Sequence, residues 1–355
     1  MELGLIGLPK SGKTTIFNAL TRAHAEISAY AGPKAGPNLA IVEVADDRVT
    51  RLAELYQPKK TVLATVTFID FAGLEAGAGQ AGIASDASMG RIKTANALAY
   101  VVRNFNDDLH GEPTCLNDIE RLDEELLISD LIITEKRLER IEASMKKGLG
   151  SNPLKLEEKV LRRVHEQLGN GLPIRALELS GDEEVAIRGF QFLTDKPVLV
   201  ILNSDESSFG RHQDLLARIE RRHRALEFAG AFEMELSRLA DDEAKEFMDD
   251  MGIPESARAR LTRLAHEVVG YISFFTVGQD EVRAWNIRRG STALEAAATV
   301  HTDMARGFIR AECFTYDELM ECGSEKTVKE KGRFRLEGKQ YVVQDGDILS
   351  IRFSV

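Results

Sequence analysis

The sequence predicts an α/β fold of the P-loop class, interrupted by a helical hairpin and followed by a small α+β domain. Residues 3–6 form a short apolar strand that leads into a glycine-containing loop and then a helix. Apolar side chains recur at seven-residue spacing over residues 127–168, as expected of two packed helices. The apolar stretch 196–202 then returns the chain to a strand. We therefore expect one α/β domain that an insertion divides.

Length and composition are typical of a globular protein. The 355 residues suffice for two or three domains with a large core. No apolar run is long enough to cross a bilayer, and the N-terminus lacks the basic start and cleavage site of a signal peptide. Three widely spaced cysteines indicate neither a disulfide framework nor a zinc site. The expected location is the reducing cytoplasm.

The remaining elements follow from the same patterns. Residues 31–37 are rich in glycine and proline and predict a loop, as does the turn at 148–153 inside the hairpin. Further strands are expected at 39–44 and 61–69, another buried segment at 95–105, and helices up to about 271. The predicted domains are 1–115 with 184–271 for the α/β fold, 116–183 for the hairpin, and 272–355 for the last domain.

The loop after the first strand matches the pattern G-x-x-x-x-G-K-[ST] in full. Gly7 and Gly12 let backbone N–H groups face an anion, and the following helix adds the positive end of its dipole. Lys13 suits the β- and γ-phosphates of a nucleotide and is therefore also a catalytic candidate, while the Thr14 hydroxyl suits Mg²⁺. The other loop residues expected to bind the nucleotide are Lys10, Ser11 and Thr15.

A second motif follows the predicted strand 61–69. Asp70 ends the apolar run, and Gly73 stands three residues later, as in the D-x-x-G motif. Asp70 would hold Mg²⁺ through water, and the N–H of Gly73 would contact the γ-phosphate. Leu74 occupies the place where many GTPases carry the glutamine that orients the attacking water. Another group must therefore assist hydrolysis, or hydrolysis is slow.

A base-recognition loop is expected after the strand 196–202. A guanine site usually reads N-K-x-D, whereas here Ser204 replaces the lysine and Glu206 replaces the aspartate. Asn203 is expected to tie this loop to the P-loop. The pattern favours ATP over GTP. A GTPase of the same fold, and a nucleotide-dependent binding module with negligible turnover, remain alternatives.

Two groups of arginines are candidate contacts with nucleic acid, the second with RNA phosphates in particular, although the net charge of −11 argues against a surface that binds nucleic acid throughout. The first group comprises Arg218, Arg221, Arg222 and Arg224, and its alternative is a solvated helix face. The second comprises Arg283, Arg288, Arg289, Arg306 and Arg310 in the last domain, and its alternative is solvation or pairing with carboxylates. The last domain has no phosphate loop, so we expect it to dock a partner.

Together these residues resemble the YchF family, the Obg-like ATPases of the TRAFAC class. The resemblance covers nearly the whole chain, and its most specific part is C-terminal, where residues 283–285, 301–303, 307–312 and 341–347 look like the family's TGS domain. It implies a ubiquitin-like β-grasp module at the C-terminus. It also implies a protein that prefers ATP to GTP, hydrolyses it slowly with Mg²⁺, and associates with ribosomes.

The resemblance further implies a histidine that assists hydrolysis. His110 is the matching candidate, and the alternative is an ordinary surface histidine. The chain also departs from the family. Lys10 and Ser11 replace the usual asparagine and valine, and Pro33 and Lys34 stand where a cysteine and a Mg²⁺-binding threonine are usual. A lysine would repel the metal, so closure of this switch loop over Mg²⁺ is in doubt. The oligomeric state stays open.

Overall fold

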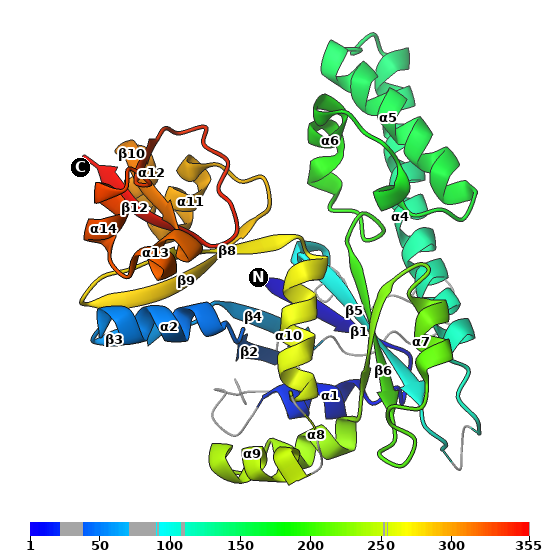
Figure 1. Ribbon diagram of the computed structural model, residues 1–355. Coiled ribbons are helices and arrows are strands. Elements are labelled where there is room, and N and C mark those ends of the chain that lie inside the picture. Colours follow the sequence, from blue (N-terminus) through cyan, green and yellow to red (C-terminus); the bar gives the residue numbers. More distant parts are fainter. Residues whose placement is uncertain are drawn as a thin grey trace. The chain divides into compact units, whose positions relative to one another are not determined.

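The computed structural model describes residues 1–21, 38–70, 90, 92–107, 111–250, 253 and 255–354. The chain divides into two compact units, coloured along the sequence in Figure 1. The larger unit comprises residues 2–40 and 67–258, and the smaller unit comprises Met1, Ile41–Val66 and Ala259–Val355. Residues 41–66 therefore belong with the C-terminal segment, a grouping that the sequence did not suggest. No helix among the described residues is long and apolar enough for a membrane span.

The larger unit is built on a six-stranded sheet of order β2-β4-β1-β5-β6-β7. Its strands are β1 Glu2–Ile6, β2 Asn38–Glu43, β4 Thr65–Asp70, β5 Ala97–Asn104, β6 Val198–Ser204 and β7 Arg224–Phe228. β1 pairs in parallel with β4 and β5, and β6 pairs in parallel with β5 and β7. Such strands are covered on both faces, which is why every residue of β6 is buried. The carboxyl ends of β1, β4 and β6 meet at one edge, where α/β sheets bind ligands.

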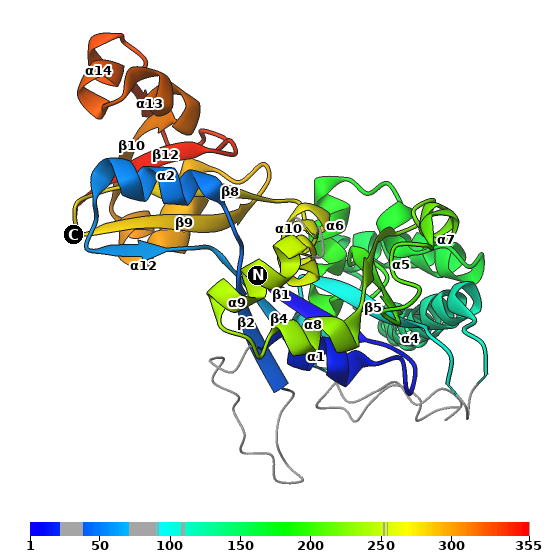
Figure 2. The same ribbon diagram turned by 60° about the horizontal axis from the view of Figure 1, so that its bottom comes forward.

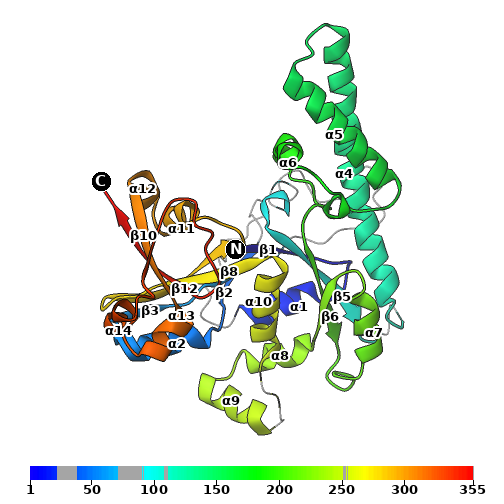
Figure 3. The same cartoon turned by 45° about the horizontal axis from the view of Figure 1, so that its top comes forward.

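Helices complete the larger unit. They are α1 Lys13–Leu20, α4 Cys115–Lys146, α5 Asn152–Gly169, α6 Gly181–Ile187, α7 Gln213–Ile219, α8 Gly230–Leu236 and α9 Asp241–Asp250. Figures 1 and 3 show α4 and α5 running side by side, which confirms the predicted hairpin. The Ser151 side chain caps α5 by accepting a hydrogen bond from Leu154 N, and proline occupies its first turn. Ile141 of α4 packs with Val160 and Val164 of α5 in the hairpin core.

The smaller unit holds a second six-stranded sheet, of order β11-β10-β12-β8-β9-β3. Its strands are β3 Lys60–Val62, β8 Tyr271–Thr276, β9 Glu281–Arg288, β10 Phe308–Thr315, β11 Arg335–Glu337 and β12 Asp347–Phe353. Its helices are α2 Asp47–Tyr56, α10 Ala257–Val268, α11 Ala293–Val300, α12 Thr302–Arg306, α13 Tyr316–Cys322 and α14 Glu325–Glu330. β8 and β9 form an antiparallel hairpin, and β12 pairs with β8 in parallel. This hairpin, helix α11 and central parallel pair are the β-grasp arrangement that the resemblance implies.

Two strand predictions were wrong. The run 61–69 is not one strand, because β3 pairs with β9 in the smaller unit while β4 pairs with β1 in the larger one. An apolar run does not reveal which partner each half will find. β7 lies where only helices were expected. Its sequence, RALEF, contains two charged residues, yet its last four positions are buried.

Candidate functional site

The P-loop makes close contacts that leave no room for side chains at its two glycines. A Cβ added to Gly7 would lie 2.6 Å from the carbonyl oxygen of Val101 on β5. Gly12 has a φ of +86°, and a Cβ there would lie 2.1 Å from Nδ2 of Asn203. Real Cβ atoms do not approach other atoms so closely, and the left-handed backbone at Gly12 also favours glycine. The motif's glycines are thus required by packing as well as by the loop's shape.

Lys13 and Asp70 meet at the carboxyl edge of the sheet. Lys13 begins α1, Asp70 ends β4, and the Lys13 ammonium donates to the Asp70 carboxylate in an ion pair. Their side chains are only 11% and 9% exposed. The structure therefore joins the predicted phosphate-binding cation to the predicted metal-binding carboxylate, although 57 residues separate them in sequence.

The same corner offers groups that suit an anion and a hard cation. The Ser11 hydroxyl is buried and has no hydrogen-bond partner among the described residues. Thr14 lies exposed in the first turn of α1, and no side chain in the described part of the chain caps that helix. Uncapped N–H groups of a helix suit phosphate oxygens. A carboxylate and a threonine hydroxyl are oxygen ligands of the kind that Mg²⁺ prefers. The donor set thus fits a Mg²⁺-nucleotide.

Asn203 links the base loop to the P-loop, as the sequence predicted. Its side chain is buried, and its Nδ2 donates to the carbonyl oxygen of Ser11 over 3.0 Å. Its Oδ1 accepts a hydrogen bond of 3.1 Å from the backbone N–H of Gly230, at the start of α8. One side chain therefore holds three segments in register behind the phosphate loop.

Ser204 lies inside the protein. Its hydroxyl is buried, donates to Oε1 of Glu227 over 2.6 Å and accepts from Nδ2 of Asn104 over 2.8 Å. Glu227 on β7 also accepts from Gly210 N at 2.9 Å, and the His212 ring Nδ1 lies 2.7 Å from it. Glu227 thus holds both ends of the loop that carries Glu206, which is exposed.

Sequence reasoning missed Glu227 and Asn104. The available signal was a charged residue inside an otherwise apolar segment, since buried carboxylates are rare unless they are paired or hydrogen-bonded. The structure brings the P-loop together with Asp70 and Asn203, and Ser204 follows Asn203 at the end of β6, while Glu206 lies exposed in the next loop. Gly73, Leu74, His110 and the switch residues Pro33 and Lys34 lie outside the described residues.

Comparison with known proteins decides the family. Residues 2–137 match a family described as 50S ribosome-binding GTPase, and residues 271–354 match YchF-GTPase_C, described as a protein of unknown function (DUF933). The whole chain is 38% identical to the Ribosome-binding ATPase YchF of Haemophilus ducreyi, over 99% of that relative. The chain belongs to the YchF family. It is also 36% identical to the Ribosome-binding ATPase YchF of Bacillus subtilis over the full length of both chains.

A solved YchF structure shares the fold. The Schizosaccharomyces pombe YchF GTPase superposes with a TM-score of 0.85 at 30% identity, covering 99% of this chain and 97% of that one. The relatives' names differ in the nucleotide, since some say ATPase and this one says GTPase. The nucleotide preference of this chain is therefore inferred from the residues of its own base loop.

Proposed function

We propose that this YchF protein is a slow, Mg²⁺-dependent ATPase that binds ribosomes. The observation that carries the proposal is the buried Lys13–Asp70 pair beneath a P-loop braced by Asn203. In P-loop proteins a lysine and an aspartate at these positions serve the phosphates and the metal respectively. The curated YchF relatives are named ribosome-binding ATPases, which supports both parts of the proposal.

The residues of the corner take separate roles in this proposal. Backbone N–H groups of the P-loop and of the first turn of α1 hold the phosphates, with Lys13 adding a charge that follows the transferred group. Thr14 and Asp70 would hold Mg²⁺, which neutralises charge on the phosphate oxygens when bound. Lys10, Ser11 and Thr15 would contact the same phosphates, and Gly73 would contribute its N–H.

The base loop supports ATP. The lysine of a guanine site packs beside the base, but Ser204 is buried and engaged with Asn104 and Glu227. Glu206 is exposed at the position where guanine recognition requires aspartate, and its longer side chain places the carboxylate differently. A GTPase of the same fold is the second candidate, favoured by the name of the solved relative.

Competition between ATP and GTP for the purified protein tests the nucleotide preference. We expect ATP to displace a labelled nucleotide at lower concentration than GTP. A protein that binds GTP tenfold more tightly than ATP, about 1.4 kcal/mol, would overturn the assignment. Glu206→Asp should shift the preference toward GTP, and it is a safer variant than Ser204→Lys, which would place a long side chain in a buried position.

Turnover separates an ATPase from a binding module. Lys13→Ala should lose about a hundredfold or more in nucleotide affinity, because charge-assisted hydrogen bonds of this kind contribute up to about 3 kcal/mol each. Phosphate release by the wild type above that of Lys13→Ala, at saturating ATP, would support the ATPase. Equal release by both proteins would leave only nucleotide-dependent binding.

We also propose that residues 272–355 dock the partner and that residues 116–183 form a separate helical subdomain. A ribosomal partner implies a cytoplasmic location. The smaller unit's arginines are partly neutralised, since Arg283 lies 3.5 Å from Glu281, Arg306 3.8 Å from Asp303 and Arg310 3.7 Å from Glu312. Arg288 and Arg289 are exposed. Replacing these two with glutamine should weaken ribosome co-sedimentation, and unchanged sedimentation would place docking elsewhere.

A further inference from the structure

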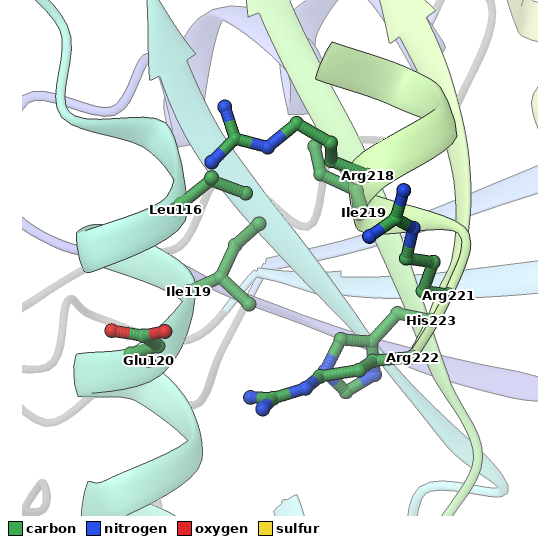
Figure 4. A pocket seen from close by; sticks show the side chains of 8 residues that line it. All are labelled: Leu116, Ile119, Glu120, Arg218, Ile219, Arg221, Arg222 and His223. Carbon is green, nitrogen blue, oxygen red and sulfur yellow. The ribbon is translucent and has the colours of Figure 1, made fainter. Parts of the chain in front are cut away.

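A small pocket opens in the larger unit, between the start of α4 and the end of α7. Its volume is about 160 Å³, and Leu116, Ile119, Glu120, Arg218, Ile219, Arg221, Arg222 and His223 line it. Figure 4 shows the Arg218 and Arg222 side chains extending from the end of α7 and the following turn toward α4, with Arg221 between them on the α7 side. They are three of the four arginines that the sequence suggested as a basic patch, whereas Arg224 does not line the pocket.

The three arginines lack the carboxylate partners that some other arginines of this chain have. Within the part of the chain that the structure describes, Arg218, Arg221 and Arg222 form no ion pair within 4.0 Å. By contrast, Arg137 lies 2.6 Å from Glu157, and Arg352 lies 2.9 Å from Glu312. Like charges three and four residues apart repel one another. What distinguishes these three from other exposed arginines is that they line one pocket together, and three cations around one pocket favour an external anion.

The base of the pocket is held in place from inside. The buried His223 ring places Nε2 3.0 Å from Oδ2 of Asp123 on α4, and the hydroxyl of Tyr100 donates to Oδ1 over 2.9 Å. Burial acts to raise the pKa of Asp123, but the interactions with His223, Tyr100 and Arg175 together outweigh it, so that this pKa is lowered. The turn that carries Arg221 and Arg222 is thus anchored to α4 through the adjacent His223, and the guanidinium groups extend from a fixed base.

The chemistry of the pocket suits phosphate. Guanidinium groups offer paired N–H donors that match phosphate oxygens. The volume corresponds to roughly five water molecules, enough for a phosphate group with part of a sugar. Leu116 and Ile119 provide an apolar wall against which a ribose can lie. The lone carboxylate, Glu120, is outnumbered by the three arginines.

We propose that this pocket binds the phosphate backbone of RNA. The inference rests on the proposed ribosome binding and gives it an RNA contact on the larger unit. This RNA contact is separate from the docking proposed for the smaller unit. In the smaller unit, three of the five arginines already have carboxylate neighbours.

The test uses the full chain with Arg218, Arg221 and Arg222 replaced by glutamine. Its matched control replaces three exposed arginines of the same unit, namely Arg140, Arg188 and Arg238. Fluorescence anisotropy would measure binding to a labelled, unstructured 20-nucleotide RNA across a salt series. We expect the pocket variant to bind at least tenfold more weakly and its salt slope to fall by about 2, since each lost phosphate contact removes about 0.7 on a single strand. The control should stay within twofold of the wild type.

Parallel measurements separate this inference from the proposed function. ATP turnover of the pocket variant should equal that of the wild type, and ribosome co-sedimentation should fall. If the wild type sediments with ribosomes while the pocket variant matches it in sedimentation and RNA affinity, the pocket inference is wrong and ribosome binding stands. If the variant loses ribosomes but keeps full RNA affinity, the pocket contacts protein, which also overturns it. If the wild type binds neither RNA nor ribosomes, both ideas fail.

Discussion

At the scale of single residues, Asn203 shows how one side chain can define a site. Gly12 and Gly230 both lie so close to it that a Cβ would clash, at 2.1 Å and 2.8 Å from its side-chain atoms. Its amide therefore occupies a space made by two glycines, and it satisfies the carbonyl group of Ser11 and the N–H of Gly230. Such a site tolerates few substitutions, because any side chain at Gly12 or Gly230 would clash with Asn203.

We expect Asn203→Ala to lower the free energy of unfolding by about 2–4 kcal/mol, because it leaves a buried carbonyl group and a buried N–H without partners. Nucleotide affinity should fall as well, since the P-loop loses its brace. Urea unfolding followed by circular dichroism checks the first effect. The exposed Asn106→Ala is the matched control and should stay within about 0.5 kcal/mol. Equal stability of both variants would contradict the bridging role.

His110→Ala addresses hydrolysis. Leu74 cannot orient the attacking water, so either another group does so or hydrolysis is slow, and the YchF resemblance makes His110 the candidate group. We expect turnover to fall about tenfold to a hundredfold or more, because positioned acid–base groups typically contribute at least this much. Nucleotide affinity should be unchanged in a calorimetric titration. Equal turnover in His110→Ala and wild type would remove His110 from the mechanism.

The cysteines should differ in reactivity. Burial raises the pKa of Cys115 to about 11, and burial with the nearby charge of Asp347 does the same for Cys313. At pH 8 only about one such thiol in a thousand is ionised, and the thiolate is the reactive form. Iodoacetamide should therefore modify the partly exposed Cys322 first, as mass spectrometry of digested protein would show. Modification of Cys115 at the rate of Cys322 would contradict this.

At the scale of elements, the hairpin is joined to the sheet by a buried carboxylate on α4. Asp130 accepts hydrogen bonds from the backbone N–H groups of Leu193 and Thr194, at 3.0 and 2.7 Å, and from the Thr194 hydroxyl at 2.8 Å. Leu193 and Thr194 immediately precede the segment that enters β6. The position of the inserted helices therefore depends on a polar contact, not only on their apolar faces.

Asp130→Ala should lower the free energy of unfolding by about 3–5 kcal/mol, because it leaves buried hydrogen-bond donors without an acceptor and without access to water. Asp130→Asn retains an acceptor oxygen and should cost clearly less. Denaturant titration of both variants measures the difference. Glu139→Ala, at an exposed position of the same helix, serves as the control. Similar losses in Asp130→Ala and Glu139→Ala would show that the contact is unimportant.

At the scale of the whole molecule, the smaller unit contains residues 41–66, a segment from the first part of the chain. α2 packs on β9, β3 extends the same sheet, and Figure 2 shows α2 lying along it. Arg48 donates to the carboxylate of Asp345 over 2.8 Å, and the Tyr56 hydroxyl donates to Glu325 over 2.8 Å. Residues 41–66 connect β2 and β4 of the larger unit's sheet. The C-terminal segment therefore contributes to the fold of a segment that lies about 200 residues before it in the chain.

A chain truncated after residue 270 should therefore be damaged beyond the loss of its last domain. β3 loses its partner strand, and the buried Val49 and Leu52 of α2 lose their cover. We expect increased binding of a hydrophobic dye and rapid proteolysis within residues 44–64, compared with the full chain. If this segment stays as resistant as in the full chain, it folds without the C-terminal strands. Point variants are thus the sounder test of docking.

Local sequence patterns are enough to predict part of this protein. The P-loop, Asp70, the bridging Asn203 and the helical hairpin were all predicted, because a motif with fixed chain spacing and a repeating apolar pattern carry their own geometry. Only the tertiary structure shows which sheet each half of 61–69 joins and that Glu227 forms a buried hydrogen-bond network behind Ser204. Strand pairing and buried polar contacts depend on residues far apart in the chain, so local sequence patterns do not predict them.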